Sequence, residues 1–234
     1  MGLIDATVIT STSESGGGIN IGGSFQGQGP LPNASLVFVN EGTQLYAIAL
    51  DSGDGGTVIV WADEVTQFMG NVQARGGSQT GDGGFVEISG KQTLAFDGIV
   101  DTTAPQGELG TLLLDPKNIR IVAPENGEIN STETNVPFGA APEDTVIASS
   151  TLESATTDVI LQANYDIIVD DDIDTTISGP NPSLMLQAGR NIDLNASIRL
   201  IDGNFTAIIN DAAADPSERE PGVAQFTLAD GETL

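Results

Sequence analysis

A repeat of 28 residues is the feature that most constrains the fold of this chain. Residues 53–80 align without a gap over residues 81–108, and eight of the 28 positions are identical, beginning with a GDGG block. A third copy, shortened by two residues, follows at 110–115, and a partial copy precedes at 17–23. Copies of a fixed period form equivalent structural units that stack on their neighbours, so the sequence predicts a solenoid.

Within the copies, an apolar position alternates with a position that accepts charge, which is typical of a strand with one buried side. Stacking the copies in register predicts an apolar core ladder of Val58, Val60, Val86, Ile88, Leu112, Leu114, Phe68 and Phe96. The intervening positions form outward columns, with Glu87 in one column and Trp61, Ser89 and Asp115 in another. We therefore expect Glu87 to face water, and Glu87→Lys to be nearly silent.

A second repeat type occupies the C-terminal third. The segment 158–163 (DVILQA) recurs 25 residues later as 183–188 (SLMLQA), and a looser copy lies at 205–209. Strand-like repeats of this length without a convincing amphipathic helix predict an all-β fold, a parallel β-solenoid. The leucine-rich repeat pattern and tandem calcium-binding nonapeptides are both missing from the sequence.

The repeats divide the chain into two blocks of one solenoid. We expect Gly-rich coils over 1–121, a polar, Pro-rich excursion over 122–157, and the LQA coils over 158–234. Residues 150–155 could form one helical turn that braces the side of the solenoid. A second excursion is expected over 211–221, before a last strand at 224–228.

Composition excludes several function classes. The chain has no Cys and no His, so it holds no disulfide, Cys-ligated zinc or imidazole base. Its 33 Asp and Glu residues against 7 Lys and Arg residues give a net charge of −26, which disfavours nucleic acid and anionic membrane surfaces. No apolar run approaches the roughly 20 residues needed for membrane insertion.

Two features invite a binding-site interpretation. Four carboxylates within five residues could hold calcium, the one cofactor left open; they are Asp170, Asp171, Asp172 and Asp174. A solvated turn between coils is the simpler interpretation of this cluster. Trp61, the single tryptophan, could stack on a sugar ring, although we expect a neighbouring loop within 24–43 to cover it.

An enzyme is the main rival to a structural role, because parallel β-helices also carry polysaccharide-processing sites. Asp115, Lys117 and Arg120 come together in the sequence. No second carboxylate occupies the column of Asp115 in the preceding copies, so the paired acid and base of a glycosidase is unsupported. We therefore expect no catalytic residues.

The runs at 19–35, 55–77, 81–91 (GDGGFVEISGK) and 110–121 (GTLLLDPKNIRI) together resemble filamentous-haemagglutinin-like exoproteins of two-partner secretion, especially the large cyanobacterial members. The resemblance covers most of the chain. It implies a right-handed parallel β-helix that is exported by an outer-membrane transporter. It also implies a non-enzymatic shaft at the cell surface, which serves adhesion or the extracellular matrix.

The resemblance also frames the remaining expectations. The start of the chain has no basic and apolar signal segment, so we expect an internal shaft segment of a secreted protein. The outer-membrane transporter is the expected partner of the full-length protein, and surface glycans and self-association are left open. The alternatives are a polysaccharide-processing enzyme and a module that calcium stiffens.

Overall fold

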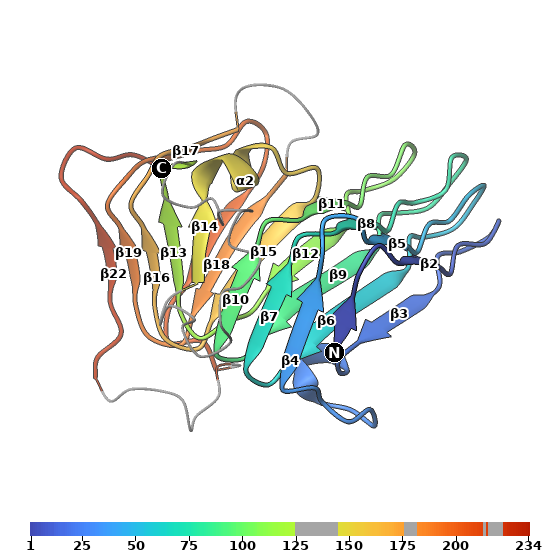
Figure 1. Cartoon of the computed structure of the whole chain (residues 1–234). Helices are drawn as coiled ribbons and strands as arrows, with labels where there is room; N and C mark the ends of the chain where they lie inside the picture. The colour runs from blue at the N-terminus through green and yellow to red at the C-terminus, as the bar shows by residue number, and fades with distance from the viewer. Residues whose placement is uncertain (125–144, 176–181, 213, 215–221) are drawn as a thin grey trace.

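The chain folds as an all-β parallel β-helix, as the repeat predicts (Figure 1). The structure is a computed structural model that describes residues 1–124, 145–175, 182–212, 214 and 222–234. Successive short strands belong in turn to different faces, and each strand pairs in parallel with the equivalent strand of the next coil.

The first face is one sheet of seven strands, which in spatial order are β21 (Phe205–Ile208), β18 (Leu184–Ala188), β15 (Asp158–Ala163), β12 (Thr111–Leu114), β9 (Phe85–Gly90), β6 (Thr57–Ala62) and β3 (Gly18–Ile21). We call it the long sheet. Its order follows the chain without exception, so the coils of both repeat types belong to one stack.

The second face consists of two sheets. The first holds β1 (Gly2–Leu3), β4 (Leu36–Val39), β7 (Val65–Phe68) and β10 (Thr93–Phe96); the other holds β14 (Thr145–Ala148), β13 (Ile119–Val122), β16 (Ile167–Val169), β19 (Ile192–Leu194) and β22 (Phe226–Leu228). The third face holds β2 (Thr7–Ile9), β5 (Gln44–Tyr46), β8 (Asn71–Gln73) and β11 (Ile99–Asp101), then β17 (Ile173–Asp174) and β20 (Ile198–Arg199).

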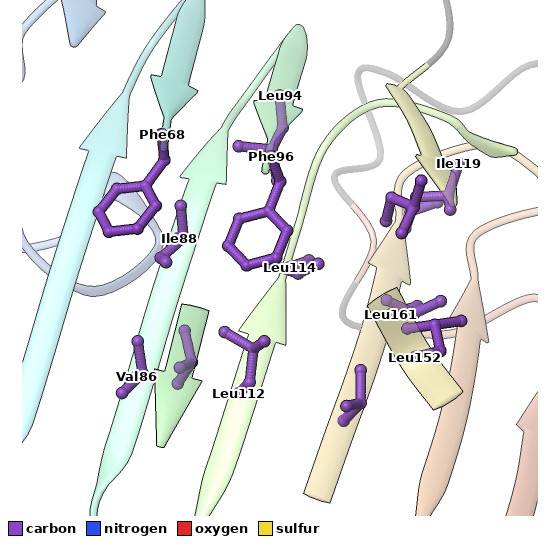
Figure 2. Packing of buried hydrophobic residues seen from close by; sticks show 14 of the residues in the cluster. Phe68, Val86, Ile88, Leu94, Phe96, Leu112, Leu114, Ile119, Leu152 and Leu161 are labelled. Carbon is purple, nitrogen blue, oxygen red and sulfur yellow. The ribbon is translucent and has the colours of Figure 1, made fainter. Parts of the chain in front are cut away.

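The register of the long sheet produces the predicted core columns. Val58 pairs with Val86, which pairs with Leu112. The next inward column stacks Val60, Ile88 and Leu114, and all six side chains are buried. On the second face, the rings of Phe68 and Phe96 stack with centroids 6.1 Å apart and planes 13° apart (Figure 2). The core ladder is therefore continuous along the axis.

One strand breaks the chain order. After β13 the chain returns as β14, which pairs with β13 on the side that faces β10 rather than on the side of β16. The hydroxyl of Thr145 accepts a hydrogen bond from the Leu94 N–H of β10 at 3.0 Å. The strand β14 therefore stands between two coils that the sequence suggests are direct neighbours.

The helix α2 (Ser149–Glu153) follows β14 and packs against β17, with Leu152 buried. It confirms the single helical turn expected near 150–155. The Asp101–Thr156 bridge then ties the chain to β11 before β15 begins. Of the two predicted excursions, residues 125–144, 213 and 215–221 lie outside the described residues.

The Thr145 hydroxyl gives a test of the β14 insertion. We expect Thr145→Val to lower the free energy of unfolding by about 1–3 kcal/mol, because the buried Leu94 N–H loses its acceptor while the side-chain shape is kept. Urea unfolding of both proteins measures this difference. The matched control is Thr227→Val, whose hydroxyl donates to Asp193 in an exposed position. Equal losses of unfolding free energy in the two variants would mean that the Leu94–Thr145 hydrogen bond does not stabilise the position of β14 beside β10.

Candidate functional site

Residues 22–34 form a strap across the outer face of the long sheet. Its 3₁₀ turn, η1 (Phe25–Gly27), contacts β6, and the N–H of Ala34 donates to the carbonyl of Gly22 to close the loop. The Phe25 ring meets the Phe85 ring edge-on, with centroids 5.8 Å apart. The strap thus anchors on two neighbouring coils of the sheet.

Trp61 lies beneath the strap and is 4% exposed. A Cβ atom on Gly27 would stand 2.6 Å from the indole ring, so the strap backbone rests directly on the ring. The indole N–H donates to Asp63 at 3.0 Å. The expected loop cover of Trp61 is confirmed, and the face of this ring under Gly27 is closed to any ligand.

Glu87 is also beneath the strap and is fully buried. The expectation that it faces water is wrong. Alternation does place it on the outer side of the sheet, but there the Gln26 N–H donates to both of its carboxylate oxygens at 3.1 Å. Burial raises the pKa of Glu87 to about 7, while the Gln26 hydrogen bond acts in the opposite direction. We therefore expect Glu87→Lys to be damaging rather than silent.

Asp115 forms a second carboxyl group in this region, 9% exposed. Its pKa is raised to about 7, first by burial and then by the negative charge of Glu87, and an interaction with the Gln26 side chain opposes the rise. The sequence inference holds for the column itself, where Trp61 and Ser89 precede Asp115, but a carboxylate neighbour exists outside that column. Glu87 pairs with Leu113, two residues before Asp115, so the neighbour stands diagonally and not in the same column.

The other two residues of the predicted Asp115 cluster lie elsewhere. Lys117 Nζ sits 4.7 Å from the centroid of the Tyr165 ring, and Arg120 pairs with Asp170. Gln162, the residue that follows Asp115 in the column on the next coil, instead accepts a hydrogen bond from the Gln26 side chain at 3.0 Å. The strap residue Gln26 thus joins three coils of the long sheet.

A cavity of about 440 Å³ opens beside the strap. Its lining includes Gln28, Asn33, Trp61, Lys91, Asp115 and Asn164. Asn33 is held by the bonds that its side-chain NH₂ donates to the Gly27 carbonyl at 3.0 Å and to Asp63 at 2.9 Å. Asp115 lies in the cavity wall and Glu87 does not, so a solute in the cavity meets one acid of the pair.

The predicted calcium cluster is divided among different partners. Each carboxylate from Asp170 to Asp174 engages a separate group, mostly on a neighbouring coil. The pairs are Asp170 with Arg120 at 2.5 Å, Asp171 with the Ser149 hydroxyl at 2.7 Å, Asp172 with the Ser197 N–H at 2.8 Å, and Asp174 with Arg199 at 3.1 Å. Across the described ranges, no three acidic side chains gather closely enough to hold a metal ion.

The strap is expected to open when Gly27 is replaced by alanine. Gly27 has a φ of +65° and no room for a Cβ against the indole ring, so Gly27→Ala strains the turn. Because Trp61 is the single tryptophan, its emission should shift to the red and its quenching by acrylamide should increase, while the far-ultraviolet circular dichroism stays unchanged. The control is Gly18→Ala in β3, where an added Cβ meets nothing within 4 Å. Identical spectra for both variants would refute the cover.

Comparisons of the chain with known protein families and with curated proteins identify no family for it. No protein-family model matches the chain, and no curated protein matches its sequence. In the part of the chain that the structure describes, none of the helices has the length and apolar character to cross a membrane.

Proposed function

We propose that this chain is a non-enzymatic shaft segment of a secreted cell-surface exoprotein of the filamentous-haemagglutinin-like, two-partner-secretion type. The observation that supports the proposal best is the continuous core ladder through seven parallel strands of one sheet. Such a stack gives length with little bending, because each coil adds about 4.8 Å and is hydrogen-bonded to the next. In this proposal the stacked coils of the described chain serve to extend the protein away from the cell.

Contacts between coils also support a shaft. Ion pairs and hydrogen bonds link equivalent turns about 25 residues apart, as between Asp166 and Arg190 or between Asp170 and Asn195. On the Gly-rich side, Asp82 accepts from the Glu108 N–H and donates its own N–H to Asp54. These ladders hold the turns in register at the surface, where the apolar core does not reach.

In this proposal the outer faces supply adhesion. An outer-membrane transporter exports the full-length protein, and its shaft then contacts surface glycans, matrix or a second copy. The net charge of −26 keeps such a rod apart from nucleic acid and from anionic lipid. Adhesion therefore depends on local sites along the rod.

The shaft proposal is tested by measuring the distance between two dyes placed at different points along the axis. Dyes placed on Glu41→Cys and Asp193→Cys, in a chain that has no other cysteine, lie beside β4 and on β19. The six strand spacings between them correspond to about 30 Å along the axis, and we expect energy transfer to report a narrow distribution consistent with that spacing. The distribution and the thermal midpoint should be unchanged by calcium or chelator. A broad distribution overturns the shaft, and a midpoint raised by calcium favours the calcium-stiffened module.

The adhesive part is tested with beads that carry the chain. Coated beads should be retained on fixed bacterial cells with their extracellular matrix, more strongly than beads that carry Leu114→Asp, a variant expected to unfold because Leu114 is fully buried. Retention equal to that of the variant beads overturns the adhesive role.

One observation favours a second candidate, a polysaccharide-processing enzyme. Two carboxyl groups with pKa values raised to about 7 lie beside a cavity on the outer face of a β-helix sheet, and glycosidases use such a pair. Against it, Glu87 is covered by Gln26 and only Asp115 lines the cavity. Release of reducing ends or unsaturated product from cellulose, starch or polygalacturonate would favour the enzyme and overturn the non-enzymatic proposal.

A further inference from the structure

The cavity beside the strap combines a suitable size with a polar wall. Its volume of about 440 Å³ lies in the range of small-molecule sites. Gln28, Asn33 and Asn164 contribute amide groups, and Asp115 contributes a carboxyl group. We propose that this cavity is a binding site for a neutral saccharide, with Asp115 and Gln28 as two of its polar contacts. The inference rests on the adhesive function proposed above and names a ligand class for it.

The chemistry of the wall selects hydroxyl groups. The Gln28 amide presents both a donor and an acceptor and Asp115 presents a carboxyl group, whereas the Asn33 NH₂ is already engaged by Gly27 and Asp63. A sugar hydroxyl both donates and accepts, so one ligand can form hydrogen bonds with Gln28 and Asp115 at once. An apolar ligand would cover the polar groups of Gln28 and Asp115 without offering them a hydrogen bond, which is unfavourable. A polyol therefore fits this wall better than a lipid or an aromatic compound does.

Charge selects a neutral ligand. Asp63, Asp115 and Lys91 are the titratable side chains of the wall, so the wall has no excess of positive charge. The chain as a whole carries −26, which repels a uronate or a sulfated glycan. A divalent cation is disfavoured because, among the residues the structure describes, three acidic side chains do not converge here or elsewhere.

The wall is held in place before a ligand arrives. Gln26 on the strap donates to Gln162 on β15, and Asn33 donates to Asp63, which also accepts from the Trp61 indole. These bonds connect the strap to β15 and to the residue that follows β6. A site with fixed polar groups loses less entropy on binding than a flexible loop does.

The test uses the full chain with cellotetraose, maltotetraose and mannotetraose as probes, and tetragalacturonate as the charged comparison. Titration is followed by calorimetry and by Trp61 emission, since Trp61 is both the single tryptophan and part of the wall. We expect saturable binding of at least one neutral probe, no binding of tetragalacturonate, and no cleavage product. Binding of tetragalacturonate alone, or of none of the four, overturns the proposal.

Variants locate the binding. Asp115→Ala should raise the dissociation constant of the bound saccharide at least tenfold, and Gln28→Ala should raise it about threefold. Gln28 is exposed on the strap, so its variant stays informative if Asp115→Ala disturbs folding. The control is Glu41→Ala, an exposed acid outside the cavity, with no change expected. Undiminished binding in the Gln28 and Asp115 variants overturns the site. If coated beads still adhere while no saccharide binds, the proposal of a saccharide site is overturned, whereas the proposal of an adhesive shaft is not.

Discussion

Replacing Leu114 by aspartate is expected to leave the chain unfolded. Leu114 is fully buried in β12, paired between Ile88 and Leu161. Removing the side chain alone costs about 2–5 kcal/mol, and burying an unpaired carboxylate costs several more. Because whole domains are stable by only about 5–15 kcal/mol, the sum approaches or exceeds what the fold has. Far-ultraviolet circular dichroism and urea unfolding measure the loss, and Val86→Asp should behave in the same way.

The matched control is Ile99→Asp. Ile99 is in β11, which belongs to the same coil as Val86 in β9, but the Ile99 side chain is 66% exposed. The chemical change is the same, yet the carboxylate stays in water, so we expect a loss of less than about 1 kcal/mol. Similar losses at Leu114 and Ile99 would mean that the inward and outward columns are assigned incorrectly.

Stability is also expected to fall as the pH rises from 5 to 8. Folding raises the pKa of Glu87 from 4.5 and that of Asp115 from 3.8, both to about 7. Between these limits the folded chain holds protons that the unfolded chain has released, so each increase in pH favours unfolding. Above both folded pKa values the effect is complete. The pair accounts for a loss on the order of 5 kcal/mol across this window.

Amide variants isolate this effect from the general charge of the chain. Glu87→Gln and Asp115→Asn should flatten the dependence of the urea midpoint on pH and should be more stable than the parent at pH 8. Glu41→Gln removes one exposed carboxylate and should keep the parental slope. Trp61 emission, recorded in the same titration, reports whether the strap loosens as the pair ionises. A parental slope in both Glu87→Gln and Asp115→Asn would exclude these two carboxyl groups as the origin of the pH dependence.

Much of the fold could be predicted because its signals are local and repeated. The 28-residue spacing places Phe68 on Phe96 and Val58 on Val86, and alternation decides which side of each strand is inward. Each coil repeats the same evidence, so an error in one copy is corrected by the next. The position of β14 carries no such signal, since Thr145 lies outside both repeats and its contact to Leu94 spans 51 residues.

The site could not be predicted in the same way. Alternation tells which side of a sheet Glu87 lies on, but not whether a distant loop covers that side. The cover comes from Gln26, which is 61 residues earlier in the chain. One signal was present in the sequence: Glu87 shares its outward column with the aliphatic residues Ile59 and Leu113, and two aliphatic residues in such a column indicate a covered face. Both are buried in the structure.

The reversed placement of β14 has a consequence for how the rod assembles. A stack that grows by adding one coil at a time offers each new strand the edge left by the strand before it. On the second face, β10 instead meets residues 145–148 through packing and the Leu94–Thr145 hydrogen bond, and these residues follow β11, β12 and β13 in the chain. Growth in chain order can therefore continue along the long sheet, where β12 pairs directly with β9, whereas on the second face the edge of β10 stays open until residues 145–148 follow.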